Sequence, residues 1–181
     1  MILNADFFDR DVVEVARNLI GIELLVDGVG GLIIETEAYR ADDPAAHSFG
    51  GQTIRNKSMF GLPATVYVYR SYGLHWCLNF VCRSGSAVLI RALEPQQGIR
   101  SMELRRNTNH QKLLCSGPGR LTQALAIDAR LDGTNVLLLP FQLCRRETPD
   151  IVSGPRIGIS KAIDYPWRFG KLGSAFWSRR F

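Results

Sequence analysis

The segment from Gly31 to Tyr39 carries two glutamates, Glu35 and Glu37, inside an otherwise apolar run. Its β-branched and apolar residues predict a strand. The Asp27-Gly28 pair before it predicts a tight turn from an earlier strand over residues 22–26. A strand this apolar belongs in the centre of a sheet, where a carboxylate is tolerated only with hydrogen-bonding or charged partners. The chain must therefore fold so that other residues meet these two glutamates.

Side chains two residues apart share one face of a strand. This alternation predicts one face with Leu32, Ile34, Thr36 and Ala38 and an opposite face with Ile33, Glu35, Glu37 and Tyr39. Two carboxylates and a tyrosine then lie together beside a polar loop over residues 40–58, and a loop of that length often carries function. A solvated edge strand with a chance pair of glutamates is the alternative interpretation.

The rest of the chain alternates between strand-like and helix-like segments. A helix capped by Asp9 or Asp11 and ended by Gly21 is expected before the first strand. Further strands are predicted over residues 65–70, 74–82, 87–92, 135–139 and 155–160, and helices over residues 95–106 and from the N-cap Ser116 onward. Short turns between strands, with the helices set apart, indicate an α+β fold: one domain over residues 1–181 with a mostly antiparallel, curved sheet and surrounding helices.

Composition narrows the class of partner. The 181 residues can bury a core without disulfides or a metal, and 22 Lys and Arg against 17 Asp and Glu leave a charge of +5, which favours an acidic partner. The chain has no run of 18 apolar residues, so no membrane span is expected. The first ten residues also lack the pattern of a signal peptide, so a cytoplasmic protein is expected. The four cysteines form no Cys-x-x-Cys pair, which favours reduced thiols in or near the core over a zinc site.

Three tyrosines follow the polar loop. Tyr67 and Tyr69 alternate with valines, so both rings point to the same face of their strand. Tyr72 lies at the next turn, between Ser71 and Gly73, where a ring is exposed unless another surface covers it. Ordinary packing explains any one of these rings alone. Together with a basic chain and a strand that bears carboxylates, they are typical of proteins that stack bases in an electropositive groove.

A set of short motifs, in a fixed order along nearly the whole chain, resembles the alkyladenine (3-methyladenine) DNA glycosylase family. The motifs are Ile-Ile-Glu-Thr-Glu-Ala-Tyr (33–39), Asp-Pro-Ala-Ala-His-Ser (43–48), Arg-Asn (55–56), Met-Phe (59–60), Val-Tyr-Val-Tyr (66–69), Tyr-Gly (72–73), Asn79, Leu-Ile-Arg-Ala-Leu-Glu-Pro (89–95) and Leu-Cys-Ser-Gly-Pro (114–118). The chain departs from the family's pattern in two places: the loop over residues 40–46 is shorter than in vertebrate members, and Gly119 stands where a hydroxyl residue is expected.

The resemblance implies a role for each matching residue. Glu37 matches the glutamate that deprotonates the attacking water, and Arg91 matches the arginine that helps to position this water. The residues matching the base pocket are Tyr39, His47 and Tyr69, which sandwich the flipped base, and Asn79, which stands near the position of a guanine amino group. Tyr72 matches the residue that inserts into the duplex, and the main-chain N–H of His47 matches the group that contacts the edge of the base.

The implied activity is excision of a damaged purine from double-stranded DNA, with 3-methyladenine, hypoxanthine, 7-methylguanine and ethenoadenine all open as substrates. No cofactor or metal is expected, and the enzyme is expected to act as a monomer on the nucleoid. No lysine shares the strand with Glu37, which predicts a hydrolase without lyase activity. The candidate phosphate contacts are Arg55, Lys57, Arg100, Arg105, Arg106, Arg120, Arg179 and Arg180. Glu35 is expected to be a buried partner of an arginine such as Arg91.

Three other functions use the same residues. A metal-dependent nuclease could bind Mg²⁺ through Glu35, Glu37, Asp42 and Asp43. A binding module, including one directed at RNA, would use the tyrosines only to stack bases. A hydrolase of small nucleosides would use Glu37 but would need neither the excess of basic residues nor Tyr72.

Overall fold

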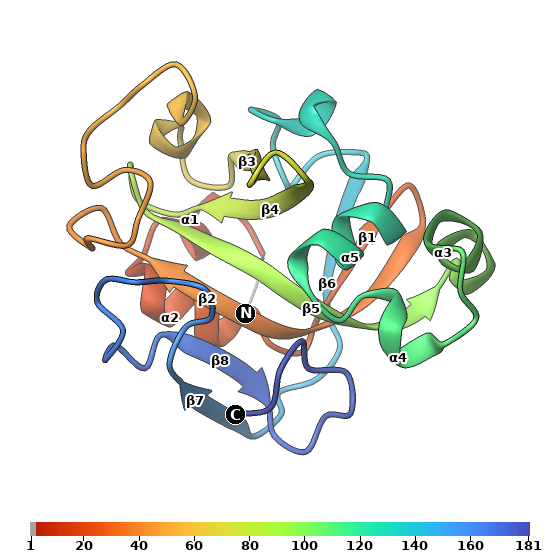
Figure 1. Ribbon diagram of the computed structural model, residues 1–181. Coiled ribbons are helices and arrows are strands. Elements are labelled where there is room, and N and C mark those ends of the chain that lie inside the picture. Colours follow the sequence, from red (N-terminus) through yellow and green to blue (C-terminus); the bar gives the residue numbers. More distant parts are fainter. Residues whose placement is uncertain (1–2) are drawn as a thin grey trace.

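The structure is a computed structural model that describes residues 3–181. One antiparallel sheet, with short helices around it, forms the α+β fold that the sequence predicts (Figure 1). The strands are β1 (Ile22–Val26), β2 (Val29–Tyr39), β3 (Val66–Ser71), β4 (His75–Val81), β5 (Ala87–Gln97), β6 (Phe141–Arg145), β7 (Ile151–Gly154) and β8 (Arg168–Lys171). The helices are α1 (Ala5–Phe8), α2 (Val12–Asn18), α3 (Ile99–Arg106), α4 (Gln111–Leu114) and α5 (Pro118–Ala124), with 3-10 turns η1 (Lys57–Phe60) and η2 (Ala129–Leu131).

Strand β2 lies at the centre of the sheet. The strand order is β3-β4-β5-β2-β1-β6, and β8 also pairs with β2 and carries β7 on its other side. One edge of β2 pairs with β5 along its length, and the other edge pairs first with β1 and then with β8. Glu37 thus lies opposite Leu89 of β5 and opposite Arg168 of β8. Both glutamates are enclosed by neighbouring strands, so the alternative of a solvated edge is wrong.

A bulge in β2 changes which residues share a face. The pairing with β5 shifts between Ile33 and Glu35, so the strict alternation predicted across the whole strand is wrong. Ile33 lies in the main core, whereas Leu32 and Ile34 pack against Phe176 and Trp177 on the other side. An extra residue in one strand shifts its alternation by one position.

Beyond the bulge the prediction holds. Ala38 lies in the main core and Thr36 Oγ1 donates to the carbonyl of Ala16 in α2, while Glu35, Glu37 and Tyr39 lie on the opposite face.

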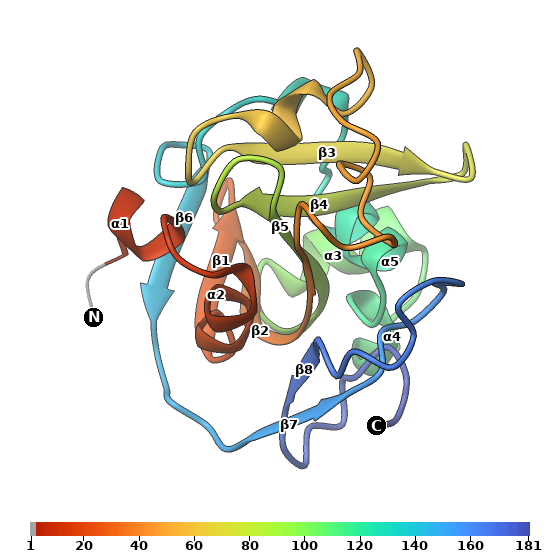
Figure 2. The same ribbon diagram turned by 90° about the vertical axis from the view of Figure 1, so that its left-hand side faces the viewer.

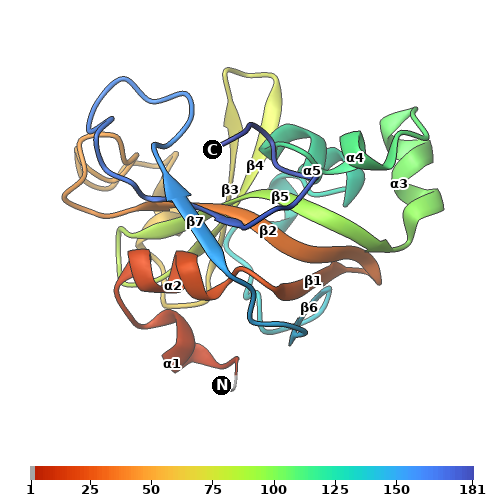
Figure 3. The ribbon, with the colours of Figure 1, turned by 90° about the horizontal axis from the view of Figure 1, so that it is seen from below.

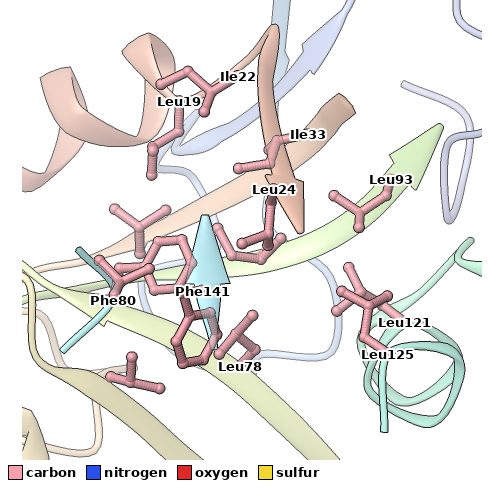
Figure 4. Packing of buried hydrophobic residues seen from close by; sticks show 14 of the residues in the cluster. Leu19, Ile22, Leu24, Ile33, Leu78, Phe80, Leu93, Leu121, Leu125 and Phe141 are labelled. Atoms are coloured by element: carbon pink, nitrogen blue, oxygen red, sulfur yellow. The ribbon is translucent and has the colours of Figure 1, made fainter. Parts of the chain in front are cut away.

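Of the predicted N-terminal elements, the Asp11 cap and the first strand are confirmed, but the helix ends at Asn18, with Leu19 as its C-cap, and not at Gly21. Asp11 caps α2 by accepting from the Val13 N–H at 2.9 Å, and β1 has the predicted bounds. Helix α2 packs on the sheet, and the main core continues to α5 on the other part of the sheet (Figure 4). The labelled core residues in that view come from five strands and from the segments around α2 and α5: Leu19, Ile22, Leu24, Ile33, Leu78, Phe80, Leu93, Leu121, Leu125 and Phe141.

Several predictions for the second half are wrong. Strand β5 continues through Pro95 to Gln97, so the helix expected from Pro95 starts at Ile99. The N-cap of α5 is Gly117, with no side-chain cap bond, in place of Ser116. Residues 135–139 and 155–160 are not strands; only an isolated bridge joins Thr65 to Asn135. Strands β6, β7 and β8, which were not predicted, come from segments whose pairing partners are far away in sequence.

The cysteines are free thiols, as expected. Cys77, Cys82 and Cys115 are buried, but Cys144 is exposed on β6, at the edge of the sheet, which corrects the expectation that all four lie in or near the core. Within residues 3–181, no helix has the length and apolar character that crossing a membrane requires.

The hairpin of β3 and β4 extends beyond the rest of the molecule, and its tip is the turn at Tyr72 and Gly73 (Figure 2). Seen from below, α1 and α2 lie on one side of β2 (Figure 3). The C-terminal tail, which is the segment after β8 (residues 172–181), lies on the other side, together with the loop that joins β7 to β8. The face of β2 that carries Glu35 and Glu37 is therefore covered by chain segments from the end of the sequence.

Candidate active site

A cavity of about 650 Å³ opens on this face of the sheet. Its volume lies in the range of ligand-binding cavities, roughly 300–1,000 Å³. Seven of the nine predicted site residues line it, and these are Tyr39, His47, Arg55, Tyr69, Tyr72, Asn79 and Arg91. The two others are Glu37, which lies directly behind the lining, and Arg120, which lies on α5 outside it.

Glu37 has no exposed surface, yet each of its oxygens has a hydrogen-bond donor. Oε2 accepts from the Tyr39 hydroxyl at 2.8 Å and from Arg91 Nη1 at 3.2 Å. Oε1 accepts from the main-chain N–H of Ile157 at 2.7 Å. All three donor residues line the cavity, so the carboxylate is separated from it by a single layer of its own partners.

Tyr39 connects the carboxylate to the aromatic wall. Burial raises the pKa of the Tyr39 phenol well above its ordinary value, and the neighbouring Glu37 raises this pKa further. The hydroxyl therefore stays protonated and acts as the hydrogen-bond donor to Glu37. The Arg156 guanidinium lies 4.7 Å from the centre of the Tyr39 ring. Arg156 is itself held by a buried ion pair with Asp43 and by a hydrogen bond of 2.9 Å to the carbonyl of Ala38.

Arg91 is buried and bridges the two glutamates. Its Nε donates to Oε1 of Glu35 at 3.1 Å and its Nη1 donates to Glu37. Burial tends to lower the pKa of the Arg91 guanidinium, but Glu37 and Glu35 outweigh burial and raise this pKa above its ordinary value. Glu35 receives a second guanidinium, Arg168 Nε from β8, at 2.9 Å. The expectation that Glu35 is a buried partner of Arg91 is confirmed.

Three rings form one wall of the cavity. Tyr67 and Tyr69 are stacked with centroids 5.4 Å apart, and His47 lies edge-on to Tyr69 at 4.4 Å. His47 Nδ1 is 3.0 Å from the Tyr67 hydroxyl. Burial of the ring and the nearby Arg55 lower the pKa of His47, so the ring is neutral at pH 7. The loop that carries His47 is held by Asn56, whose amide donates to the carbonyl of His47 at 2.8 Å.

Asn79 and Tyr72 both line the cavity, but one is buried and the other is exposed. Asn79 is buried, and its amide donates to the carbonyl of Tyr67 at 3.1 Å. Tyr72 is 89% exposed at the tip of the hairpin. Its backbone has φ of 50° and that of Gly73 has φ of 69°, which makes this a tight turn in the left-handed region. The ring of Tyr72 thus projects from a tight turn and is almost fully exposed.

The basic residues predicted to contact phosphates have different surroundings. Arg55 lines the cavity, and its Nη2 donates to the carbonyl of Arg70 at 3.1 Å. Arg120 is exposed and bonds Ser116 Oγ at 3.1 Å. Arg105 and Arg106 donate to carbonyls at Ala124 and Leu114, so part of their bonding capacity is used inside the protein.

Gly119, where a hydroxyl residue was expected, lies against β4. A Cβ atom at this position would be 2.8 Å from the Cβ of His75, closer than real Cβ contacts. The helix α5 approaches the hairpin too closely for a side chain here.

Sequence reasoning missed part of the site. The segment from Ile157 to Lys161 lines the cavity, and Ile157 holds Glu37, although this segment was interpreted as a strand. Pro155 before it and Gly158 within it, at φ of 77°, were signals for a loop. Arg168 and Ser178, which bond Glu35, had no local signal at all, because their role depends on contacts across more than 130 residues.

The acids proposed for a magnesium site are each bonded to arginines. Asp42 pairs with Arg40, Asp43 with Arg156, and Glu35 with Arg91 and Arg168. Among the residues that the structure describes, no three His, Cys, Asp or Glu side chains are grouped so as to hold a metal ion. These acids are arranged as ion pairs and do not converge on a common centre.

The fold and the cavity define an α+β protein with a carboxylate behind an aromatic, base-sized cavity and an exposed tyrosine beside its opening. A family model described as methylpurine-DNA glycosylase (MPG) matches residues 6–175. The chain belongs to this family of DNA-repair glycosylases, which confirms the resemblance seen in the sequence.

Similar proteins cover the chain almost completely. One from Agrobacterium fabrum, named "Putative 3-methyladenine DNA glycosylase", is 59% identical over 176 residues, which cover 97% of this chain and 91% of that protein. Proteins with the same name from Rhizobium meliloti and Nitrosospira multiformis are 58% and 57% identical. The matches cover 98% and 96% of this chain, and 97% and 92% of those proteins.

Proposed function

We propose that this protein takes an alkylated or deaminated purine out of duplex DNA into the cavity and hydrolyses its N-glycosidic bond with a water activated by Glu37. The candidate bases are 3-methyladenine, hypoxanthine, 7-methylguanine and ethenoadenine. The observation that carries the proposal is the Glu37 carboxylate, which is held by three donors directly behind a cavity of about 650 Å³ with aromatic walls. The relatives named for 3-methyladenine support the choice of a damaged purine.

The reaction breaks one bond and forms one. At C1′, a water oxygen attacks, Glu37 takes a proton from this water, and the base leaves with the electrons of the C1′–N bond. A cationic base such as 3-methyladenine leaves as a neutral molecule, whereas a neutral base such as hypoxanthine leaves as an anion and takes up a proton from solvent. The products are an abasic site and a free base. The carboxylate also stabilises the positive charge that develops on the sugar, and Arg91 orients Glu37 and the water.

The rings recognise the base. Tyr39, His47 and Tyr69 offer flat faces, and each good contact with a cationic base such as 3-methyladenine contributes roughly 0.5–2 kcal/mol. A neutral His47 does not repel such a cation. Neutral lesions such as hypoxanthine gain less from the rings and need hydrogen bonds, for which the main-chain N–H of His47 is the candidate. Asn79 limits the room beside the position of a guanine amino group.

Tyr72 and the basic residues act on the duplex. Extruding a base costs a few kcal/mol, and a rigid ring in the vacated space opposes its return. Tyr72 has the exposure and the position on a tight turn for this task. Arg55 beside the cavity and Arg120 on α5 are the candidate phosphate contacts. Neutralising about five phosphates would give a log–log salt slope of about −4 to −5.

The burial of Glu37 has a consequence for this reaction. Because Tyr39, Arg91 and Ile157 separate its oxygens from the cavity, water reaches the carboxylate only when one of these partners shifts. Binding of the flipped nucleotide is the natural cause of such a shift.

The surroundings of Glu37 support a pure hydrolase without lyase activity. No lysine is present in β2, and Lys161, which lines the cavity, is exposed. The product should therefore be an intact strand with an abasic site.

The test is release of free base from duplexes that each carry one defined lesion, in the presence of EDTA. Wild type is compared with Glu37→Gln, and with Glu94→Gln as a control carboxylate that lies on β5 away from the cavity. We expect wild type and Glu94→Gln to release the base without cutting the strand. Glu37→Gln should fold and bind lesion DNA but lose at least about 100-fold in rate, a typical contribution of a general base.

Each rival predicts a different result. Loss of activity in EDTA would support the metal-dependent nuclease, and binding without any base release would support a binding module. Excision from free nucleosides at the rate seen in duplexes would support the small-molecule hydrolase. Normal excision by Glu37→Gln would overturn the assigned role of Glu37.

A further inference from the structure

Arg91 uses both ends of its guanidinium. Nε and Nη2, which form one edge of the planar group, bond Glu35 Oε1 at 3.1 Å and Ser178 Oγ at 3.3 Å. Nη1, at the other end, bonds Glu37 Oε2 at 3.2 Å. The direction in which Nη1 points is therefore set by the two groups on the opposite edge.

Ser178 has the hydrogen-bond geometry to orient Arg91. Its hydroxyl donates to Glu35 Oε1 at 2.7 Å, which leaves its lone pairs free to accept from Arg91 Nη2. Its main-chain N–H donates to the other oxygen of the same carboxylate. Glu35, Arg91 and Ser178 thus form a closed ring of hydrogen bonds, in which removal of the hydroxyl leaves one nitrogen of a buried cation without a partner.

Arg168 balances the charge of the buried cluster that contains this ring and Glu37. The side chains of Glu35, Glu37, Arg91 and Arg168 are all buried, and their two negative and two positive charges cancel. Because Arg168 supplies Glu35 with its own cation at 2.9 Å, Arg91 can share its charge with Glu37. Buried charges are stable only when they are paired and hydrogen-bonded.

The tail that carries Ser178 is firmly attached. Phe176 and Trp177 pack on Leu32 and Ile34, and Trp177 Nε1 donates to the carbonyl of Lys171 at 3.0 Å. The ring of Phe181 lies on the Arg168 guanidinium, with 3.8 Å between the centroid and the central carbon.

This docking needs a glycine in β8. A Cβ atom on Gly170 would meet Phe181 Cζ at 2.7 Å, so a side chain here would displace the Phe181 ring from this position. The tail lies on the face of β2 opposite α2 (Figure 3).

We propose that Ser178 is a positioning residue for excision: the C-terminal tail completes the active site by holding Arg91, and through Arg91 the carboxylate of Glu37. This inference rests on the proposed function of Glu37. Ser178 does not line the cavity, so it acts on the reaction through Arg91 and not by touching the base.

The experiment compares the single-turnover excision rate with the affinity for a lesion duplex in wild type, Ser178→Ala, Ser178→Cys and Ser178→Thr. Ser178→Cys keeps the volume but bonds weakly, and Ser178→Thr keeps the hydroxyl. Ser174→Ala is the matched control, because Ser174 lies in the same tail and its Oγ only accepts from the Phe176 N–H. Thermal unfolding of each variant is measured in parallel.

We expect Ser178→Ala and Ser178→Cys to lose about tenfold in excision rate, as expected for one hydrogen bond to a charged group, with affinity within about twofold of wild type. Ser178→Thr and Ser174→Ala should keep the wild-type rate. Wild-type rates in both Ser178→Ala and Ser178→Cys would overturn the proposal. The proposal would also be overturned if Ser178→Ala lost affinity and thermal stability together with the excision rate, or if Ser178→Thr failed to keep the wild-type rate.

The two proposals fail in different ways. If wild type releases no base, the proposed function fails. If wild type releases base and Glu37→Gln does not, while Ser178→Ala matches wild type, only the positioning role of Ser178 fails.

Discussion

The Tyr39 hydroxyl donates a hydrogen bond of 2.8 Å to Oε2 of Glu37, the same oxygen that accepts from Arg91. The two residues are on one face of β2, two positions apart, and the Tyr39 ring reaches the cavity that Glu37 does not touch. The phenol therefore joins the aromatic wall of the cavity to the carboxylate behind it. A displacement of the Tyr39 ring by a bound base would be transmitted directly to Glu37.

Replacing Tyr39 with phenylalanine should slow excision while binding remains. The ring stays, but Glu37 loses one of its three donors, so we expect the single-turnover rate to fall about tenfold or more. The affinity for a lesion duplex should stay within about twofold. Tyr69→Phe, which removes a phenol from the same cavity without touching Glu37, is the control. An equal decrease in both variants would argue against the role of this hydrogen bond.

Tyr72→Ala should reduce the affinity for a lesion duplex about tenfold, a typical contribution of stacking an aromatic side chain on a base. The ring is 89% exposed, so the free energy of unfolding should change by less than about 0.5 kcal/mol. Leu74→Ala removes another exposed side chain near the hairpin tip and serves as the control. Binding titrations with lesion and undamaged duplexes distinguish the two. A wild-type preference for the lesion duplex in Tyr72→Ala would contradict the wedge role.

Asp43→Asn should destabilise the protein by about 3–5 kcal/mol, because it leaves the Arg156 guanidinium buried without its charge partner. Both side chains are fully buried, and Arg156 also supports Tyr39 from behind. Urea unfolding measures the change. Combining Asp43→Asn with Arg156→Gln removes the unpaired charge, so the double variant should be more stable than Asp43→Asn alone. Strictly additive losses would show that the pair does not act as a unit.

Alkaline pH should destabilise the protein in part through Tyr67. Burial, followed by the nearby Asp132, raises the pKa of Tyr67 to about 12, whereas an unfolded tyrosine titrates near 10. Between these values the folded state binds more protons than the unfolded state, so stability is complete below pH 10 and is lost as the pH rises toward about 12.

Urea unfolding at pH 8, 10 and 11 checks this. Tyr67→Phe should be less stable than wild type at pH 8, because it loses the contact with His47, but should lose less stability between pH 10 and 11. Tyr165→Phe, at a partly exposed tyrosine, is the control and should follow wild type. Parallel curves for wild type and Tyr67→Phe would show that Tyr67 does not contribute to the alkaline loss.

The sequence alone predicted the structure correctly at positions where the signal comes from neighbouring residues. The Asp11 cap, the Asp27-Gly28 turn and the bounds of β1 depend on neighbouring residues, and they match the structure. The motifs of the family, with Glu37 and the tyrosines, could likewise be recognised in the chain itself. Prediction failed at Ile34, where a bulge reverses the alternation. It failed again at Pro95, because that residue lies in β5 opposite Gly31, a pairing that no local pattern encodes.

Only the tertiary structure determined how the two glutamates of β2 differ. Glu35 and Glu37 lie two positions apart on one face of β2 and are both fully buried, so their spacing alone does not distinguish them. Arg168 and Ser178, from more than 130 residues away, occupy the oxygens of Glu35 and leave Glu37 to the partners that line the cavity. A buried charge is stabilised by whichever groups surround it in space, and those groups come together only when the chain has folded.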